Sequence, residues 1–275
     1  MAREIFDSII YFPGLRLLTS VSLISVIITI IVSGGICHAV NLLDGLNGLS
    51  ICWAICAAIA MAVMALSVND MAVFRLLILL IGASIGILVW NFPLGEIFLG
   101  DAGAYTLGHV LAWMALLLMN RHPEISPLAL LLIFVWPITD MLLSMLRRKK
   151  SGRPIGQLDR LHFHQMVMRA LEIKFFTRAR RNLTNPLGIL IILPMATVPM
   201  VLAIEFKTQT GAAFIAFCGF VALFVVTYSW ALRRAGQRVH RKSRKLNQPW
   251  QLAPWPGLAR QGAGDLILTE KRYRI

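Results

Sequence analysis

Residues 21–67, VSLISVIITIIVSGGICHAVNLLDGLNGLSICWAICAAIAMAVMALS, place a single acid, Asp44, between two long apolar runs. No Asp, Glu, Lys or Arg occurs in residues 17–43 or in residues 45–69. Each run is long enough for a helix to cross the hydrocarbon core of a bilayer, which takes about 20 apolar residues. The stretch therefore predicts two membrane-spanning helices joined by a short polar connection, NLLDGLNGLS.

The rest of the chain repeats this pattern. Further windows without charged residues cover 76–95, 102–120, 125–139, 182–204 and 208–232, and the short window 125–139 becomes a full span if it continues through Asp140 to Leu146. The 275 residues are 57% hydrophobic and 15% charged, which is too apolar for an ordinary soluble domain. We predict an all-α polytopic membrane protein with about seven transmembrane helices. Its parts are a lead (1–16), a transmembrane domain (17–232) with a loop at 146–187, and a basic tail containing Pro and Gly (233–275).

The distribution of the charges that give the net charge of +14 indicates how the chain crosses the membrane. Eleven Lys and Arg residues fall in 146–187 and eleven more follow residue 232. Seven crossings place these two regions on one side of the membrane, and the positive-inside rule makes that side cytoplasmic. We therefore expect a multi-pass protein of the bacterial inner membrane, with its N-terminus outside, its C-terminus inside and no role in binding nucleic acid.

Several polar motifs are predicted to meet at the cytoplasmic rim. On its own, NLLDGLNGLS is explained as a turn in which Gly45 and Gly48 end one helix and Asp44 or Asn47 caps the next. However, FLGDAGAYTLG again places an acid, Asp101, between glycines, and two crossings separate it from Asp44. The same side receives Asp140 of WPITD and the segment LDRLHFHQ, which contains Asp159, His162 and His164. Ionisable residues at membrane depth are costly, so this cluster is a candidate site.

The residue types at this rim suit a divalent cation and phosphate groups. Carboxylate and amide oxygens are ligands for Mg²⁺, while glycine backbone and basic side chains suit phosphate. A zinc site at the HxH pair is the alternative, although no Cys or third His stands nearby in sequence. Phe98, taken alone, is more often a packing residue. The other histidines (His38, His109, His122 and His240) are interpreted without a role in the site.

Four motifs, NLLDGLNGL, NFPLGEIFLGDAGAYTLG, PITD and DRLHFHQ, occur in this order between apolar spans. In this the chain resembles the polyprenyl-phosphate N-acetylhexosamine-1-phosphate transferase family. That family includes phospho-N-acetylmuramoyl-pentapeptide transferase and undecaprenyl-phosphate N-acetylglucosamine-1-phosphate transferases. The resemblance implies transfer of a sugar phosphate from a UDP-N-acetylhexosamine to a polyprenyl phosphate, with release of UMP, at the cytoplasmic face. It also implies Mg²⁺ as cofactor, with Mn²⁺ as an alternative ion.

The resemblance implies roles for individual residues. Asp101 is expected to be the principal metal ligand and Asn41 the second. Asp44 is expected to be an essential acid beside the lipid phosphate and the sugar nucleotide. The uridine is expected to be held by Asn47, Asn91 and Phe98, and the diphosphate by His162 and His164. The HxH form favours the N-acetylglucosamine branch of the family.

The chain also departs from the family's pattern. Ala104 stands where Ser is usual, Gln165 stands where a further His is common, and three helices with an Asp-Asp motif normally precede this region. We therefore expect an N-terminally truncated member, working as a homodimer or with a separate N-terminal polypeptide. The alternatives are an inactive remnant of the same fold and, less favoured, a small-solute transporter, whose key residues belong near the bilayer midplane.

Overall fold

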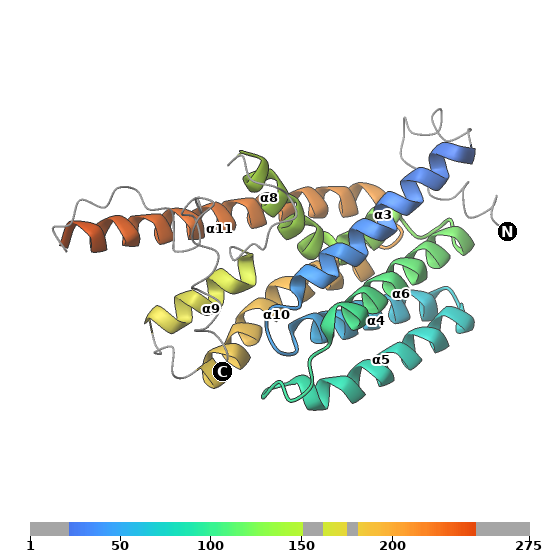
Figure 1. Cartoon of the computed structure of the whole chain (residues 1–275). Coiled ribbons are helices and arrows are strands. Elements are labelled where there is room, and N and C mark those ends of the chain that lie inside the picture. Colours follow the sequence, from blue (N-terminus) through green and yellow to red (C-terminus); the bar gives the residue numbers. More distant parts are fainter. Residues whose placement is uncertain (1–21, 151–161, 175–180, 246–275) are drawn as a thin grey trace. The chain divides into compact units, whose positions relative to one another are not determined.

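A computed structural model describes residues 22–150, 162–174 and 181–245, and this part of the chain is helical apart from short connections (Figure 1). The predicted lead (1–16), Asp159 and the tail beyond residue 245 lie outside the described residues. The helices in the described part are α3 (Ser22–Leu43), α4 (Leu49–Ser67), α5 (Met71–Asn91), α6 (Gly100–Arg121), α7 (Pro127–Ile133), α8 (Val135–Lys150), α9 (Phe163–Lys174), α10 (Arg181–Glu205) and α11 (Thr210–Lys245).

Six of these helices are long and apolar enough to cross a membrane, and α7 with α8 makes a seventh candidate if the pair counts as one span. This confirms the prediction of an all-α, multi-pass membrane protein with about seven spans. Helix α10 continues through Pro186, Pro194 and Pro199. Such prolines are tolerated in membrane helices, where neighbouring groups satisfy the backbone carbonyls that lose their partners.

The predicted fifth span is bent. Helices α7 and α8 meet at an angle of 71° around Phe134. Pro137 explains the break, because it has no N–H to donate and its ring crowds the carbonyl of the residue four positions earlier, Ile133. The bend was not predicted from the apolar windows. It directs α8, which carries Asp140, away from the line of α7.

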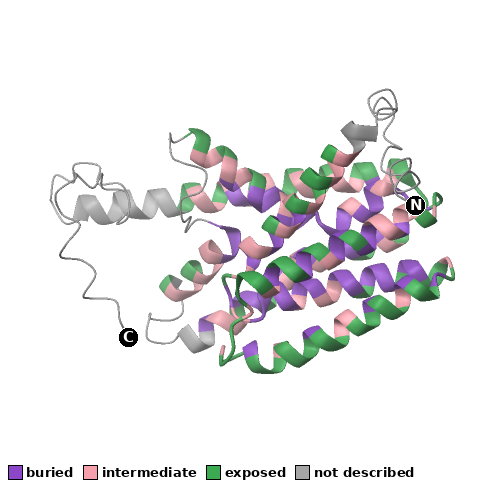
Figure 2. Ribbon diagram, turned by 45° about the vertical axis from the view of Figure 1, so that its right-hand side comes forward, coloured by how far each residue is buried: buried purple, intermediate pink, exposed green. Residues whose placement is uncertain are grey.

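Helix α4 forms the centre of the packed core. It contacts α3, α5, α6, α7 and α10, and 67% of its span is buried, whereas the span of α5 is 17% buried (Figure 2). Its buried residues include a run of alanines, and small side chains let membrane helices approach closely. At one point of this core the rings of Trp53 and Phe134 lie 5.9 Å apart. The core is thus built on α4, and α5 is attached to it at the margin.

The chain divides into two compact units, residues 1–228 and 229–275. Helix α11 begins in the first unit and continues to Lys245 in the second, beyond residue 232, where the apolar window ends. Within the second unit the guanidinium of Arg234 lies 5.1 Å from the centre of the Trp230 ring, a cation–π contact. The start of the predicted tail is therefore helical.

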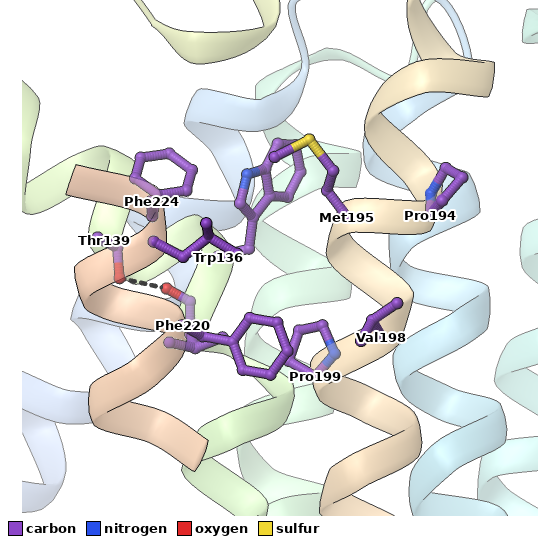
Figure 3. A pocket seen from close by; sticks show the side chains of 10 residues that line it. Trp136, Thr139, Pro194, Met195, Val198, Pro199, Phe220 and Phe224 are labelled. Atoms are coloured by element: carbon purple, nitrogen blue, oxygen red, sulfur yellow. Dashed lines mark hydrogen bonds between the residues drawn. The ribbon is translucent and has the colours of Figure 1, made fainter. Parts of the chain in front are cut away.

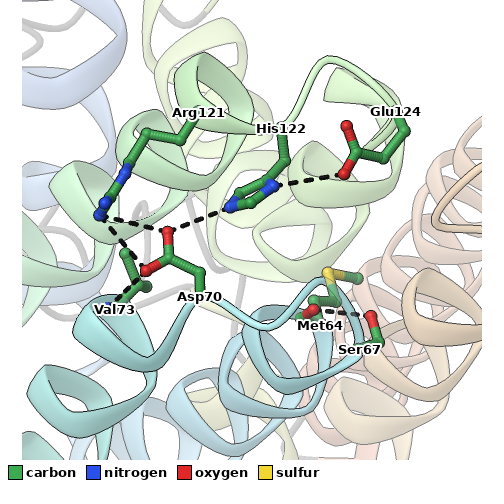
Figure 4. A network of polar contacts seen from close by, with 7 residues as sticks. All are labelled: Met64, Ser67, Asp70, Val73, Arg121, His122 and Glu124. Carbon is green, nitrogen blue, oxygen red and sulfur yellow. Dashed lines mark hydrogen bonds and ion pairs between the residues drawn. The ribbon is translucent and has the colours of Figure 1, made fainter.

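Two short connections at the other end of the spans, those that follow α4 and α6, are joined by polar contacts (Figure 4). Asp70 accepts a hydrogen bond from the Val73 backbone N–H at the start of α5, lies 3.2 Å from Arg121 Nη1 and is 3.1 Å from His122 Nε2. The other nitrogen of His122 is 3.2 Å from Glu124. The carboxylate of Asp70 is the centre of this network, which was not predicted from the sequence.

The charge state of Asp70 matters for stability. Burial alone would raise the pKa of this carboxyl, but the hydrogen bonds from Val73 and His122 and the charge of Arg121 hold the pKa below its ordinary value. A carboxyl whose pKa is lowered by folding stabilises the folded state above its unfolded pKa. That contribution is lost as the pH falls through the folded pKa.

We expect Asp70→Asn to destabilise the protein by about 1–3 kcal/mol at neutral pH, because the charge-assisted contacts of a buried carboxylate are lost. Thermal unfolding in detergent would measure this as a lower Tm, and the difference from the wild type should narrow below about pH 4. Glu124→Gln is the control, since Glu124 is 53% exposed and should matter little. An equal loss of stability at neutral and at acidic pH would contradict this account.

Candidate functional site at one rim of the helix bundle

The connection between α3 and α4, residues 44–48, is a tight turn. The Asp44 N–H donates to the Asn41 carbonyl at 3.1 Å, and Gly48 has a φ of 83°, a left-handed conformation that favours glycine. A larger residue at position 48 would also collide with Phe92, because its Cβ would lie 2.9 Å from the Cβ of Phe92. The predicted turn is confirmed, but the predicted cap is wrong. Gly48 occupies the N-cap position of α4 and no side chain caps the helix there.

Asn91, the last residue of α5, ties this turn to the connection that follows α5. Its side chain is buried, its Oδ1 accepts a hydrogen bond from the Gly48 N–H, and its Nδ2 donates to the Ile97 carbonyl at 2.7 Å. A buried amide with partners on both ends is held firmly, because breaking either bond would leave a polar group unsatisfied. In this structure Asn91 positions the two connections, and its predicted contact with uridine stays a prediction.

The connection between α5 and α6, residues 92–99, carries two further predicted residues. Asn47 lies against it, since its Nδ2 is 3.4 Å from the Pro93 carbonyl and a Cβ on Gly95 would come within 2.4 Å of that nitrogen. Phe98 is 76% exposed. The interpretation of Phe98 as a packing residue is therefore wrong, and its ring is free to contact a ligand.

Asn41 and Asp101, from the ends of α3 and α6, are brought together. Asn41 Nδ2 donates to Asp101 Oδ1 at 3.0 Å. Asp44 lies beside this pair and accepts hydrogen bonds from the Ser50 hydroxyl, at 2.8 Å, and from the Gly100 N–H. Burial raises the pKa of the Asp44 carboxyl and the charge of Asp101 adds to the rise, while the two hydrogen bonds oppose it.

The donor set of this pair fits a hard divalent cation. Asp101 has a second carboxylate oxygen and Asn41 has an amide oxygen, and Mg²⁺ commonly takes one or two protein oxygens and completes its shell with water and phosphate. Within the described ranges, no three His, Cys, Asp or Glu side chains gather closely enough to hold a metal ion by themselves. The arrangement thus suits a cation shared with a phosphate ligand, and it offers no support for zinc at the HxH pair.

His162 and His164 also reach this rim. His162 Nδ1 is 2.8 Å from Asp140 Oδ2, and the other oxygen of Asp140 accepts the Phe163 backbone N–H at 3.0 Å. The two imidazole rings stack with centres 5.8 Å apart. Asp140 therefore orients the start of α9, a role that the sequence did not reveal although it placed Asp140 on the correct side.

His164 contacts the turn that contains Asp44. A Cβ on Gly45 would lie 2.2 Å from His164 Nε2, and the ring is buried with no hydrogen-bond partner at either nitrogen. Burial lowers the pKa of His164 to about 4; Asp140 opposes this shift, and His162 adds to it. His164 is therefore uncharged at neutral pH. It can donate one hydrogen bond to a phosphate, but it brings no positive charge.

Some of the residues at this rim were missed or misread in the sequence. Ser50 and the Gly100 N–H, which hydrogen-bond to Asp44, lie inside the quoted motifs but were given no role. His38 and His109 were interpreted without a role in the site, and both are exposed on α3 and α6. Helical spacing alone does not say which face of a span is covered.

The described part of the first unit also contains an apolar pocket of about 300 Å³ between α8, α10 and α11 (Figure 3). Thr139 is its one polar side chain besides the indole of Trp136, and the Thr139 hydroxyl is donated to the Val135 carbonyl at 2.6 Å. The other lining residues are Val135, Pro194, Met195, Val198, Pro199, Phe220, Leu223 and Phe224. The pocket has no group suited to a sugar nucleotide, so the polar rim remains the candidate site.

A bundle of apolar helices with carboxylate and amide oxygens gathered at one rim defines a multi-pass membrane protein with a polar cluster at one end of its spans. Residues 4–119 match the model of glycosyl transferase family 4. The matched region includes Asn41, Asp44 and Asp101, together with the predicted uridine-binding residues. Asp140, His162 and His164 lie beyond it.

Curated relatives match about half of the chain. A probable undecaprenyl-phosphate N-acetylglucosaminyl 1-phosphate transferase of Bacillus subtilis is 32% identical over 49% of this chain and 38% of its own length. A phospho-N-acetylmuramoyl-pentapeptide-transferase of Lactiplantibacillus plantarum is 35% identical over 47% and 40%. An undecaprenyl-phosphate alpha-N-acetylglucosaminyl 1-phosphate transferase of Pasteurella multocida is 28% identical over 57% and 43%. The chain thus spans less than half the length of these relatives.

The contact between Gly45 and His164 gives a direct test of the rim. We expect Gly45→Ala to lower the Tm by several degrees, because the added methyl group displaces the ring or the turn, at a cost of about 1–3 kcal/mol. Gly86→Ala in α5 is the matched control, since a Cβ there meets nothing within 4 Å. Equal Tm values for the two variants in detergent would show that α9 does not rest on this turn.

Proposed function

We propose that this protein transfers an N-acetylhexosamine 1-phosphate, N-acetylglucosamine 1-phosphate in the preferred case, from a UDP-sugar to undecaprenyl phosphate. The observation that carries the proposal is the Asn41–Asp101 pair, 3.0 Å apart, with Asp44 beside it at the rim. The matched relatives, which act on undecaprenyl phosphate or carry the pentapeptide-transferase name, support the same class of reaction. The product would serve synthesis of cell-envelope polysaccharide, such as cell wall or lipopolysaccharide.

The reaction exchanges one phosphoric anhydride for another. An oxygen of the lipid phosphate attacks the phosphorus bonded to the sugar, and the bond from that phosphorus to the bridging oxygen breaks. UMP leaves with that oxygen, and the product is a polyprenyl-diphosphate sugar. A phosphate monoester is largely ionised near neutral pH, because its second pKa is about 6, so the nucleophile needs no strong base. The protein's task is to position two anions and offset their charge.

Asp101 and Asn41 would hold Mg²⁺, or Mn²⁺ in its place, and the ion would offset the charge of the diphosphate. Asp44 lies close enough to Asp101 to raise its own pKa, and we assign it a place beside the two phosphates. His162, held by Asp140, and the neutral His164 would donate hydrogen bonds to the diphosphate. Asn91 would act on the sugar nucleotide through the two connections that it holds.

The basic regions at 146–187 and beyond residue 232 support placing this rim on the cytoplasmic side of a bacterial inner membrane, where UDP-sugars occur. The C-terminus would be cytoplasmic and residue 22 would lie toward the outer side. The partner that we propose is a second copy of the chain, which would form a homodimer, or a separate polypeptide. A transporter is disfavoured, since the acids of the site gather at helix ends.

Purified full-length protein should release UMP from a UDP-N-acetylhexosamine when given undecaprenyl phosphate and Mg²⁺. Asp101→Ala should lower kcat by at least about a hundredfold, because the charge of the diphosphate is no longer offset. Glu124→Ala, an acid at the opposite end of the bundle, should retain activity. An inactive wild type would favour the remnant of the same fold, and an active Asp101→Ala would rule out the assigned metal site.

Phe98→Ala should raise the KM for the UDP-sugar about five- to a hundredfold, because stacking of a base on an aromatic ring contributes about 1–3 kcal/mol. The Tm should stay the same, since the ring is 76% exposed. Leu94→Ala, 66% exposed in the same connection, is the matched control and should leave both values unchanged. A lower Tm with an unchanged KM would show that Phe98 packs against the protein and does not bind the UDP-sugar.

A further inference from the structure

A line of polar side chains follows the contact between α3 and α6 from the rim into the membrane spans. The Tyr105 hydroxyl lies 3.5 Å from His38 Nδ1, and Cys37 Sγ lies 3.9 Å from His109 Nδ1. The ring of Trp113 meets His109 edge-on at 5.8 Å. Every one of these contacts falls inside the candidate spans Val26–Leu43 and Gly100–Arg121.

The depth of this line follows from helix geometry. His38 precedes Asn41 by three residues and Tyr105 follows Asp101 by four, which places them about 4.5 and 6 Å from the metal pair along their helices. The two backbones approach closely, because a Cβ on Gly108 would lie 2.8 Å from Cα of Cys37. At this point the space between the two helices is too narrow for a larger side chain.

These side chains are exposed where a membrane protein normally presents apolar residues. Tyr105 is 40% exposed, and His38 and His109 are also in the exposed class. Polar groups left against acyl chains are costly, so such residues face water, polar protein groups or a polar ligand. The exposed side chains of the α3–α6 contact therefore need a polar group beside them.

The proposed reaction supplies such a group. The UDP-sugar is water-soluble and approaches from the side of Phe98, beyond the helix ends. The lipid acceptor keeps its tail in the hydrocarbon, so its phosphate must reach Asp101 from the membrane side. On that approach the first side chains past the metal pair that can donate to a phosphate are His38 and Tyr105, which both carry donors.

We propose that His38 and Tyr105 bind the phosphate of the polyprenyl acceptor on the membrane side of the Asn41–Asp101 pair. This inference rests on the proposed function and adds acceptor-binding residues to it. The Tyr105 hydroxyl donates to a phosphate oxygen and His38 donates from its free ring nitrogen. His109 and Trp113, which lie further along α6, line the place of the first isoprene units of the acceptor.

The kinetic test uses full-length protein with Tyr105→Phe and His38→Leu. Each variant should raise the KM for undecaprenyl phosphate about tenfold, as expected for one lost hydrogen bond to a charged group, and should change the KM for the UDP-sugar less than about twofold. Thr106→Val is the matched control, because the Thr106 hydroxyl is donated to the Ala102 carbonyl at 2.7 Å within the same helix. Unchanged values in both variants, or equal rises for both substrates, would overturn the proposal.

A binding measurement separates this inference from the transfer activity. Labelled undecaprenyl phosphate is titrated onto the protein in neutral detergent without UDP-sugar, and Tyr105→Phe should weaken its binding about tenfold. If the wild type shows no transfer activity but Tyr105→Phe still weakens lipid binding, the proposed transfer function is wrong and the proposed acceptor site stands. Excess inorganic phosphate should leave most of the lipid bound. Full displacement would indicate a site for free phosphate and overturn the assignment to the acceptor.

Discussion

The amide of Asn91 is the interaction on which the arrangement of the rim depends. It accepts the Gly48 N–H and donates to the Ile97 carbonyl, and so it fixes the turn after α3 relative to the connection before α6. Asn41 and Asp44 lie at the turn after α3, and Phe98 and Asp101 lie at the connection before α6 and at the start of α6. The hydrogen bonds of Asn91 form a joint between these two segments. Because the amide is buried, losing either hydrogen bond leaves a polar group without water to replace it. This constraint adds to the direct packing of α3 on α6, which brings Asn41 and Asp101 together.

The two ends of the helix bundle use polar residues differently. At the end that holds Asp70, each charge is matched by a near neighbour, and the pKa of the carboxyl falls. At the rim, burial raises the pKa of Asp44, and the charge of the nearby Asp101 adds to the rise. His164 is buried beside them without a hydrogen-bond partner and stays neutral. The first end is satisfied within the protein, whereas the rim keeps uncompensated groups of the kind that a ligand and a cation would satisfy.

The sequence predicts the spans and the meeting of Asp44 with Asp101 because apolar windows and the number of crossings determine which connections share a side. It predicts neither the bend at Phe134 nor the role of Asp140, since both depend on how α8 leaves the bundle. Local patterns also mislead on exposure. Phe98 and His38 have ordinary packing neighbours in sequence, yet both are exposed, because a helical repeat does not say which face another helix covers. The Asp70 network escaped notice for a related reason, as its members come from separate connections.

Helix α5 packs along α4 with one face and is tied by polar contacts at its two ends, but only 17% of its span is buried. Its 21 residues extend about 31 Å, close to the thickness of a bilayer's hydrocarbon core. A membrane that is thicker or thinner than this must tilt or strain the helix. Asn91 is its last residue, so that strain is transmitted to the joint and to the segment carrying Phe98. The thickness of the surrounding lipid bilayer thereby affects the geometry of the rim.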